Sequence, residues 1–389
     1  MTITRIMNNI KRLLDLIQVL VFTRPKRAEI LVFDNCGIDI LLPIINGEKY
    51  EVLYVRRERF NVNLFLCVRW AIEWVVYKDL SYAYKVAFLK MVRPKVVLTF
   101  IDNSPSYWRM DKEFGSDSVT FISIANGRRP LLRDVNELYH SNLFCWGDID
   151  MNRYQMLGAN VVNYFPYGSL KDTCYRQRSM RSFIVRYDVA VVSEGWHGVD
   201  YDGLYGSVKK SYELMCRYVR EFVVKHGCSL AVVCRSKPDS EAYFDECEYF
   251  RGYFGNKVDL VPNSDDFGSY SGVDSARVVI ADSSSMLWEA YGRGKKVLSC
   301  AYSEDPDYIF PISGICSITE KGYDLFDHRL SYLLSISEDA YFSEIGVAPN
   351  CLVAYDELVP LDAYLKSFIG ALCQGRLDKS PDSSPKLVT

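Results

Sequence analysis

The apolar residues of this chain form short continuous runs that alternate with longer segments of helical periodicity. Residues 28–34 are an example: the sequence Ala-Glu-Ile-Leu-Val-Phe-Asp centres on an unbroken apolar stretch, and the polar turn at 35–37 contains a glycine. A run of this kind is typical of a parallel strand that is buried on both faces. In the first part of the chain we expect a helical stretch over 63–91 and strands at 28–34, 50–56, 96–101, 119–124 and 143–146.

The pattern is interrupted by a polar, basic passage at residues 164–186 and then begins again. The second part is expected to contain helices at 209–226 and 284–292 and strands at 188–193, 230–234, 258–261, 276–281 and 296–300. Strands that alternate with helices predict a doubly wound parallel sheet. We therefore expect an α/β protein with the layout of the GT-B architecture. Two Rossmann-like domains, residues 28–168 and 187–376, would face a central cleft and be joined by a linker at 169–186.

The two ends of the chain differ in composition from the rest. Residues 1–27 place apolar side chains at helical spacing with basic residues between them, which predicts a basic amphipathic helix. Such a helix suits peripheral docking on the anionic inner face of a membrane, and the alternatives are packing on its own domain or on a second copy. Residues 377–389 are rich in Ser, Pro and Lys and are expected to be disordered. The longest apolar stretch, residues 64–76, contains Arg69 and Glu73 and is shorter than a membrane span.

Composition narrows the class of protein further. The chain has 389 residues, of which 49% are hydrophobic and 24% charged, and this balance is typical of a globular protein with room for two cores. A formal net charge of −3 argues against a nucleic-acid partner, which would favour a basic excess. The 12 cysteines are scattered singly and form no CxxC pair, so we expect free thiols in a reducing cytoplasm.

The most informative segment, residues 278–298, reads Val-Val-Ile-Ala-Asp-Ser-Ser-Ser-Met-Leu-Trp-Glu-Ala-Tyr-Gly-Arg-Gly-Lys-Lys-Val-Leu. It predicts a buried strand, a hydroxyl-rich turn, a helix and a further strand. Free backbone N–H groups and hydroxyls at a helix start form an anion site, where a nucleotide phosphate can bind without a metal. The alternative is that the serines only cap the helix. The candidate nucleotide-binding residues in this segment are Asp282, Ser283, Ser284, Ser285 and, for a ribose hydroxyl, Glu289.

This strand–Ser-Ser–helix–Glu-Ala pattern resembles the donor-binding segment of GT-B bacterial sialyltransferases and Kdo transferases, and it is similar to that of CDP-glycerol glycerophosphotransferases. The resemblance implies that Ser284 and Ser285 bind the phosphate of a CMP-sugar. Those families also carry a His-Pro motif after an earlier strand. Here the corresponding segment, 232–239, keeps Pro238 but has Lys237 in place of the histidine, with Arg235 nearby. A lysine can neutralise phosphate but is a poor general acid at neutral pH.

A looser resemblance concerns residues 24–34 and 124–129, which look like segments of proteins described as surface carbohydrate biosynthesis proteins. It spans most of the chain in layout and implies polysaccharide assembly. The second segment includes Asn126, Arg128 and Arg129 at the end of an expected strand. These three residues are candidates for contact with an anionic donor or acceptor, and a solvated basic turn is the alternative.

Glycosyl transfer requires a carboxylate that acts as a base on the acceptor hydroxyl, or as a nucleophile if the configuration is retained. Asp34, Asp102 and Glu194 each follow an expected strand, where loops face the cleft, and ordinary turn acids are the alternative. Glu194 precedes a Gly-Trp-His-Gly sequence in which His197 is a candidate for proton transfer or phosphate contact.

Asp148 and Asp150 match the DxD pattern of metal-dependent GT-A enzymes, but they precede an expected helix, and helix capping accounts for them. We therefore expect no metal or other cofactor. The sequence as a whole predicts a cytoplasmic, metal-independent glycosyltransferase with a nucleotide-sugar donor such as CMP-Kdo and a glycan acceptor. The alternatives are a CDP-alditol phosphotransferase and a non-catalytic GT-B scaffold that binds glycan.

Overall fold

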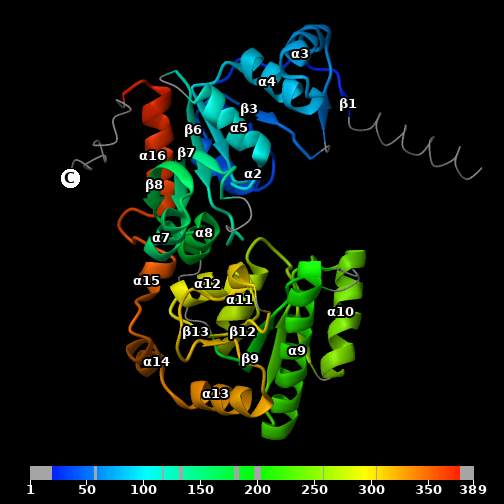
Figure 1. Ribbon diagram of the computed structural model, residues 1–389, viewed down its shortest axis with the longest axis vertical. Helices are drawn as coiled ribbons and strands as arrows, with labels where there is room; N and C mark the ends of the chain where they lie inside the picture. The colour runs from blue at the N-terminus through cyan, green and yellow to red at the C-terminus, as the bar shows by residue number, and fades with distance from the viewer. Residues whose placement is uncertain are drawn as a thin grey trace, which may run out of the picture.

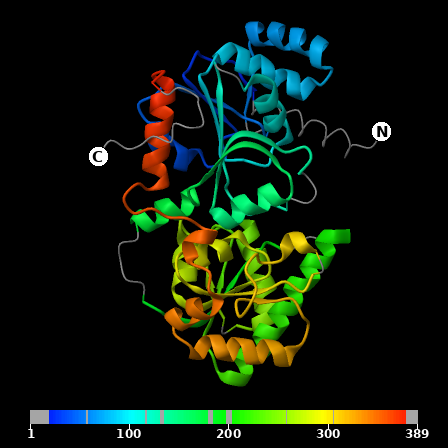
Figure 2. The same cartoon turned by 60° about the vertical axis from the view of Figure 1, so that its left-hand side comes forward.

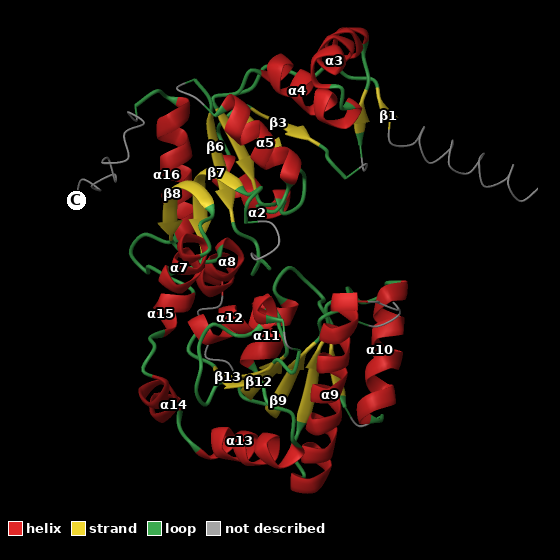
Figure 3. Cartoon of the chain, in the orientation of Figure 1, coloured by secondary structure: helices red, strands yellow, loops and turns green. Residues whose placement is uncertain are grey.

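The computed structural model describes residues 20–56, 59–115, 118–130, 135–178, 184–196, 203–256, 258–303 and 305–376. Two parallel six-stranded sheets organise this part of the chain into a first and a second domain, with helices on both faces of each sheet (Figure 3). The predicted α/β class with two Rossmann-like domains is confirmed. Residues 1–19 of the predicted N-terminal helix and the tail at 377–389 lie outside the described residues. Residues 20–27 are not helical as predicted, because Leu20 and Val21 form a short strand and the residues that follow are irregular.

The sheet of the first domain consists, in spatial order, of β3 (Tyr50–Leu53), β2 (Ile30–Phe33), β5 (Val96–Thr99), β6 (Thr120–Ile124), β7 (Tyr139–Cys145) and β8 (Asn160–Pro166). A separate pair of short strands is formed by β1 (Leu20–Val21) and β4 (Phe60–Asn61). The helices are α2 (Ile38–Ile45), α3 (Leu64–Tyr77), α4 (Leu80–Val92), α5 (Pro105–Phe114), α7 (Asp148–Met156) and α8 (Leu170–Arg178).

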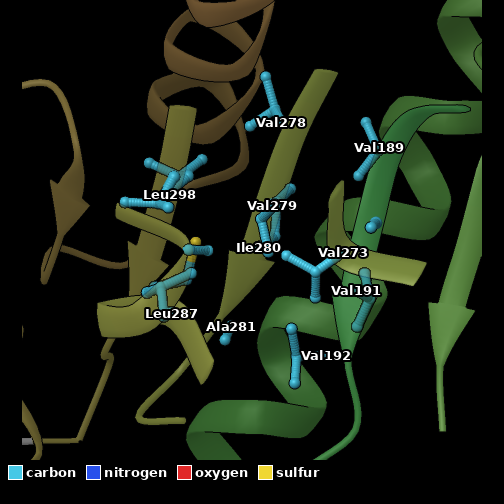
Figure 4. Packing of buried hydrophobic residues seen from close by; sticks show 14 of the residues in the cluster. Val189, Val191, Val192, Val273, Val278, Val279, Ile280, Ala281, Leu287 and Leu298 are labelled. Atoms are coloured by element: carbon cyan, nitrogen blue, oxygen red, sulfur yellow. The ribbon is translucent and has the colours of Figure 1, made fainter. Parts of the chain in front are cut away.

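The sheet of the second domain consists, in spatial order, of β11 (Asp259–Val261), β10 (Leu230–Val233), β9 (Tyr187–Val192), β12 (Ala276–Ala281), β13 (Lys296–Cys300) and β14 (Ser317–Ile318). Its helices are α9 (Gly203–His226), α10 (Glu241–Phe254), α11 (Gly268–Asp274), α12 (Ser285–Gly292), the 3-10 turn η1 (Pro306–Tyr308), α13 (Tyr323–Ser335), α14 (Glu338–Ile345) and α15 (Pro349–Leu352). Valine and isoleucine side chains of β9 and β12, including Val191 and Ile280, pack in one buried cluster (Figure 4). This cluster gives the loops at the ends of both strands a rigid base.

Several sequence predictions differ from the structure. The helical stretch 63–91 is broken into α3 and α4, because Lys78 adopts a left-handed conformation (φ 58°) and Asp79 caps α4 by accepting a hydrogen bond from the N–H of Tyr82. Residues 160–166, which include the start of the polar, basic passage at 164–186, form the edge strand β8. The expected linker 169–186 contains α8.

The last helix, α16 (Leu361–Cys373), belongs by its packing to the first domain, although the sequence grouped it with the second. Its apolar face, which includes Leu365 and Ile369, is buried in one cluster with Ile30 and Val96 of the first sheet. Figures 1 and 2 show α16 beside the upper domain, which is the first domain. In the sequence, however, this helix lies far from the strands that it covers, which all precede residue 167. In the described part of the chain, no helix combines the length and the apolar character that crossing a bilayer requires.

Candidate functional site

The site is built where the strand order of the second sheet reverses. The chain runs outward in one direction through β9, β10 and β11 and in the other through β12, β13 and β14. In open α/β sheets, ligands bind at such a switch point, outside the carboxyl ends of the two central strands. Residues 193–196, after β9, and residues 282–285, after β12, therefore occupy the position in the fold that is best suited to a ligand.

The Glu194 carboxylate binds the start of α12. Its Oε1 accepts hydrogen bonds from the backbone N–H groups of Asp282 (2.9 Å), Ser283 (2.8 Å) and Ser284 (3.1 Å). Its Oε2 accepts one from the Ser283 hydroxyl (2.9 Å). Burial raises the pKa of Glu194, and its hydrogen bonds from Ser283 act in the opposite direction. The backbone N–H groups that the sequence offered to an anion therefore bind a carboxyl group of the protein itself.

The remaining polar groups of this turn also have defined partners. Ser284 is the N-cap residue, and its hydroxyl accepts a hydrogen bond from the N–H of Met286 (3.2 Å). Asp282 accepts a hydrogen bond from the Ser211 hydroxyl, and its other carboxylate oxygen, Oδ1, is buried without a partner among the described residues. Burial and the nearby Glu194 raise the pKa of Asp282 well above its usual range. The half-buried Glu194 and the buried Asp282 therefore lie close together at the start of α12.

A basic cavity lies next to this turn. Its volume is about 690 Å³. Ser211, whose hydroxyl donates a hydrogen bond to Asp282, is one of the residues that line it. Lys210, Arg217 and Lys321 line it together with a single acidic residue, Asp305. The excess of cations makes the cavity suited to an anionic group.

The first domain contributes arginines to the same place. The backbone N–H of Arg128 donates a hydrogen bond to the Ser285 hydroxyl (2.9 Å), and its Nη1 approaches the Ser283 carbonyl oxygen (3.4 Å). Its guanidinium lies over the Tyr308 ring, 5.0 Å from the centroid, while its Nη2 is buried without a hydrogen-bond partner among the described residues. Burial and the nearby Arg153 lower the pKa of Arg128 to about 10. This cation therefore has unused hydrogen-bonding capacity beside the anion site.

Arg153, which the sequence reading missed, is the second of these arginines. It belongs to α7, and its guanidinium lies 5.5 Å from the ring centroid of Trp288 in α12. Its Nη2 is 3.4 Å from the Arg129 carbonyl oxygen, and its Nη1 is 3.8 Å from a carboxylate oxygen of Asp150. The one sequence feature associated with Arg153 is its position three residues after Asp150 of the DxD pattern.

The domains touch closely here, and Gly127 makes this contact possible. A β-carbon at Gly127 would lie 3.1 Å from the Ser285 hydroxyl oxygen, so a larger residue would require this hydroxyl to shift by a few tenths of an ångström. On the other side of the turn, Trp146 packs edge-on against Trp288, with ring centroids 6.2 Å apart. The start of α12 is consequently an interdomain element.

Asp34 and Asp102 lie at the corresponding switch point of the first sheet, after β2 and β5. Asp34 accepts hydrogen bonds from the N–H of Cys36 (2.9 Å) and from Nε of Arg56 (3.0 Å). Asp102 accepts two from Nε of Arg129 (3.0 Å each) and a further one from its Nη2. Because the same Nη2 also binds Asn126, Arg129 and Asn126 are engaged within the first domain instead of facing the anion site.

The loop after β10, which contains Arg235, Lys237 and Pro238, borders the site. The buried carboxylate of Glu246 accepts hydrogen bonds from the N–H groups of Arg235 and Ser236, both at 2.9 Å, and so fixes the loop. The Arg235 guanidinium lies beside Gly195, whose positive φ of 79° suits glycine and whose missing side chain leaves room for it. Lys237 is exposed.

Glu289 is buried one turn into α12. Its Oε1 accepts hydrogen bonds from the hydroxyls of Ser169 (2.6 Å) and Tyr270 (2.7 Å). Burial and the nearby Asp172 raise the pKa of Glu289 to about 6. Since Ser169 directly precedes α8, the carboxylate connects the two domains, and this contact was not anticipated from the sequence.

The last sequence candidates are Asp148, Asp150 and His197. Asp148 and Asp150 lie within the first turn of α7 and the N-cap residue is Gly147, so the predicted side-chain capping is not formed, although their position suits the positive end of the helix dipole. Oδ2 of Asp150 accepts a hydrogen bond from the N–H of Trp146 (3.2 Å), before the helix. Within the described residues, no group of three His, Cys, Asp or Glu side chains is arranged to hold a metal. His197 lies outside the described residues.

Fold and site together define a two-domain protein of the GT-B architecture. S. aureus MnaA in complex with UDP aligns with a TM-score of 0.53, over 90% of this chain and 97% of its own, at 12% identity. UDP-GlcNAc 2-epimerase from Neisseria meningitidis, bound to UDP-GlcNAc, aligns with a TM-score of 0.52 over 89% and 99% at 11% identity. The enzyme of the same name from Methanocaldococcus jannaschii aligns with a TM-score of 0.50 over 79% and 93% at 12% identity. At these identities the likeness establishes the fold. The sequence matches no family model and no curated protein.

Proposed function

We propose that this chain is a glycosyltransferase that binds a nucleotide-activated sugar with its phosphate at the start of α12. The observation that carries the proposal is the carboxylate of Glu194 on three successive backbone N–H groups at the switch point of the second sheet. A carboxylate and a phosphate require the same donors, because both are anions that accept several hydrogen bonds at a helix start. The similar structures that contain UDP or UDP-GlcNAc support a nucleotide-sugar ligand.

In the proposed reaction, the donor phosphate replaces Glu194 on the N–H groups of residues 282–284. Arg128 and Arg153 then neutralise the negative charge that develops on the departing nucleotide phosphate. The acceptor hydroxyl forms a bond to the anomeric carbon while the bond from that carbon to the phosphate oxygen breaks. The hydroxyl proton passes to the Glu194 carboxylate, which its release from these backbone donors leaves free to act as a general base.

For the donor we propose a CMP-activated acidic sugar of the ulosonic type. The basic cavity lined by Lys210, Arg217 and Lys321 supports this choice, because it offers cations for a sugar carboxylate close to Asp282. A growing surface glycan is the proposed acceptor. Transfer of an alditol phosphate from a CDP-linked donor would use the same anion site, and a non-catalytic scaffold would bind glycan without turnover.

The proposal is tested by titrating CMP, CDP, UDP and GDP into the wild-type chain and into Glu194→Ala, with the melting temperature and the dissociation constant as readouts. One nucleotide is expected to raise the melting temperature of the wild type, since a ligand that binds only the folded state stabilises it. Glu194→Ala removes the internal competitor, and charge-assisted hydrogen bonds of about 1.5–3 kcal/mol correspond to roughly tenfold to hundredfold tighter binding. Glu194→Gln is expected to abolish transfer and donor hydrolysis.

Glu246→Gln is the control, because Glu246 is another glutamate of the second domain whose carboxylate accepts two backbone hydrogen bonds, on a neighbouring loop. This substitution is expected to lower stability without tightening nucleotide binding. CMP as the preferred nucleotide would support the ulosonic donor, CDP the alditol phosphate reaction, and UDP a donor like the ligands of the similar structures. Binding of none of the four nucleotides would contradict the proposal.

A further inference from the structure

Helix α3 carries an apolar stripe that faces away from the protein. At about 100° per residue, the members of the stripe fall within an arc of about 120° of the helix. Their exposed fractions range from 53% for Ile72 to 75% for Leu64. The stripe consists of Leu64, Phe65, Val68, Ile72, Val75 and Val76. Scattered apolar residues on a surface are ordinary, but a contiguous stripe along a helix indicates a binding surface.

The orientation of the stripe is fixed by the opposite face of the helix. There Leu66 and Glu73 are buried, and α3 packs on α4. The Glu73 carboxylate accepts a hydrogen bond from Nζ of Lys90 (2.8 Å) in α4 and pairs with Nε of Arg69 (2.8 Å). Because these contacts of the buried Glu73 hold the helix in place, the stripe remains on the surface.

A second basic cavity, with a volume of about 760 Å³, adjoins the stripe. Phe65 belongs to both, and the Arg24 guanidinium lies 4.6 Å from the centroid of its ring. The cations that line the cavity are Arg24, Lys26, Arg27, Arg69, Lys90 and Arg93. The side chains of Arg24, Lys26, Arg27 and Arg93 are exposed and form no ion pair with a described residue. The cavity is therefore strongly positive.

We propose that the α3 stripe and this second basic cavity form the surface with which the protein docks on an anionic phospholipid bilayer. The stripe enters the boundary between headgroups and acyl chains, and the cations contact lipid phosphates. Charge complementarity favours a lipid surface over a second copy of the chain, because a two-fold interface would bring two identical sets of cations together. Figure 1 shows α3 at the end of the first domain that is remote from the second, so docking leaves the interdomain site free.

The test is co-sedimentation of the full-length chain with vesicles of phosphatidylcholine alone and of phosphatidylcholine mixed with phosphatidylglycerol. The wild type is expected to bind the mixed vesicles and to dissociate progressively as salt is added. A charge variant combines Arg24→Gln, Lys26→Gln, Arg27→Gln and Arg93→Gln. It should bind the mixed vesicles on the order of tenfold or more weakly than the wild type, since each cation near an anionic surface contributes to attraction. The stripe variant, with Val68→Ser, Ile72→Ser and Val75→Ser, should lose the binding that persists at high salt.

Two matched controls alter equally exposed positions in the second domain. Val224→Ser with Phe244→Ser matches the stripe variant, and Arg220→Gln with Arg251→Gln matches the charge variant. Both controls are expected to bind vesicles like the wild type, and all variants should keep the wild-type melting temperature because the altered side chains are exposed.

Three results would overturn the proposal. The first is a wild-type chain that does not bind the mixed vesicles. The second is a stripe variant and a charge variant that both bind vesicles like the wild type. This includes the case in which only a variant of the basic N-terminal segment, Ile10→Ser with Leu14→Ser, abolishes binding. The third is a dimer in solution that the stripe variant dissociates, because the stripe would then be an interface between two copies.

Discussion

The two sheets place acidic residues at equivalent positions but surround them differently. At the switch point of the first sheet, Asp34 is paired with Arg56 and Asp102 with Arg129. At the switch point of the second sheet, Glu194 and Asp282 form no salt bridge with any described residue. Their hydrogen bonds come from backbone N–H groups, serine hydroxyls and the indole N–H of Trp196. Burial raises the pKa of both acids in the second domain.

This difference separates acids that hold the structure from an acid that can exchange with a ligand. A buried carboxylate in a bidentate arginine pair is costly to release, because the arginine would remain uncompensated. A carboxylate on the N–H groups of a helix start can be replaced by another anion that satisfies the same donors. We therefore propose that Glu194 carries the chemistry and that Asp102, through its pair with Arg129, has a positioning role.

The largest expected effect concerns the stability of the first switch point. Arg129→Met leaves the carboxylate of Asp102, which is 1% exposed, without its partner, and we expect it to lower the free energy of unfolding by about 3–5 kcal/mol. The measurement is urea denaturation. Adding Asp102→Asn should recover most of the loss, because the uncompensated charge is then removed. A single-variant loss below about 1 kcal/mol, or no coupling between the two substitutions, would contradict the positioning role.

A second expected effect is a loss of stability in acid that arises in the first domain. His140 lies fully buried near the Asp102–Arg129 pair, and burial lowers its pKa from 6.5 to about 4. Between these two values the unfolded chain binds a proton at His140 and the folded chain does not, so stability falls as pH decreases from 6.5 toward 4. The contribution of this group is about 3 kcal/mol at most.

The check is the free energy of unfolding measured across this pH range for the wild type and for His140→Asn. The variant keeps a polar partner for Ser123 and should show a shallower acid dependence. Equal acid dependence of the wild type and His140→Asn would show that the effect arises elsewhere.

The smallest expected effect distinguishes two neighbouring arginines. Arg128→Met removes a cation whose Nη2 has no partner among the described residues, so we expect little change in stability but roughly tenfold weaker nucleotide binding. Arg129→Met should show the reverse, with a large loss of stability and little specific effect on affinity per folded molecule. Calorimetric titration and urea denaturation of both variants provide the comparison. Unchanged affinity in Arg128→Met would remove Arg128 from the site.

Most of the fold could be predicted from the sequence, because the central strands are short apolar runs, as in Ile30–Phe33 and Ala276–Ala281. The edge strand β8 was missed because residues 160–166 alternate in exposure and include Asn163 and Pro166. The return of α16 to the first domain could not be predicted, since the apolar face of a helix does not reveal which sheet it will cover.

The site could be predicted only in part. The hydroxyl-rich turn after β12 was recognisable because serines before a helix have a direct physical consequence. The contact between Glu194 and that turn joins residues 89 positions apart, and it depends on the pairing of β9 with β12. Arg128 and Arg129 were indistinguishable in the sequence, because which of two adjacent side chains meets Asp102 is decided by tertiary structure. Arg153 had no motif of its own.

The most direct test of the central claim is an experimental structure of the chain with the nucleotide that stabilises it. We predict a phosphate oxygen within hydrogen-bond distance of the N–H groups of Ser283 and Ser284, with the Glu194 carboxylate released from both. A bound nucleotide whose phosphate lies elsewhere, while Glu194 keeps its hydrogen bonds to the start of α12, would contradict the account.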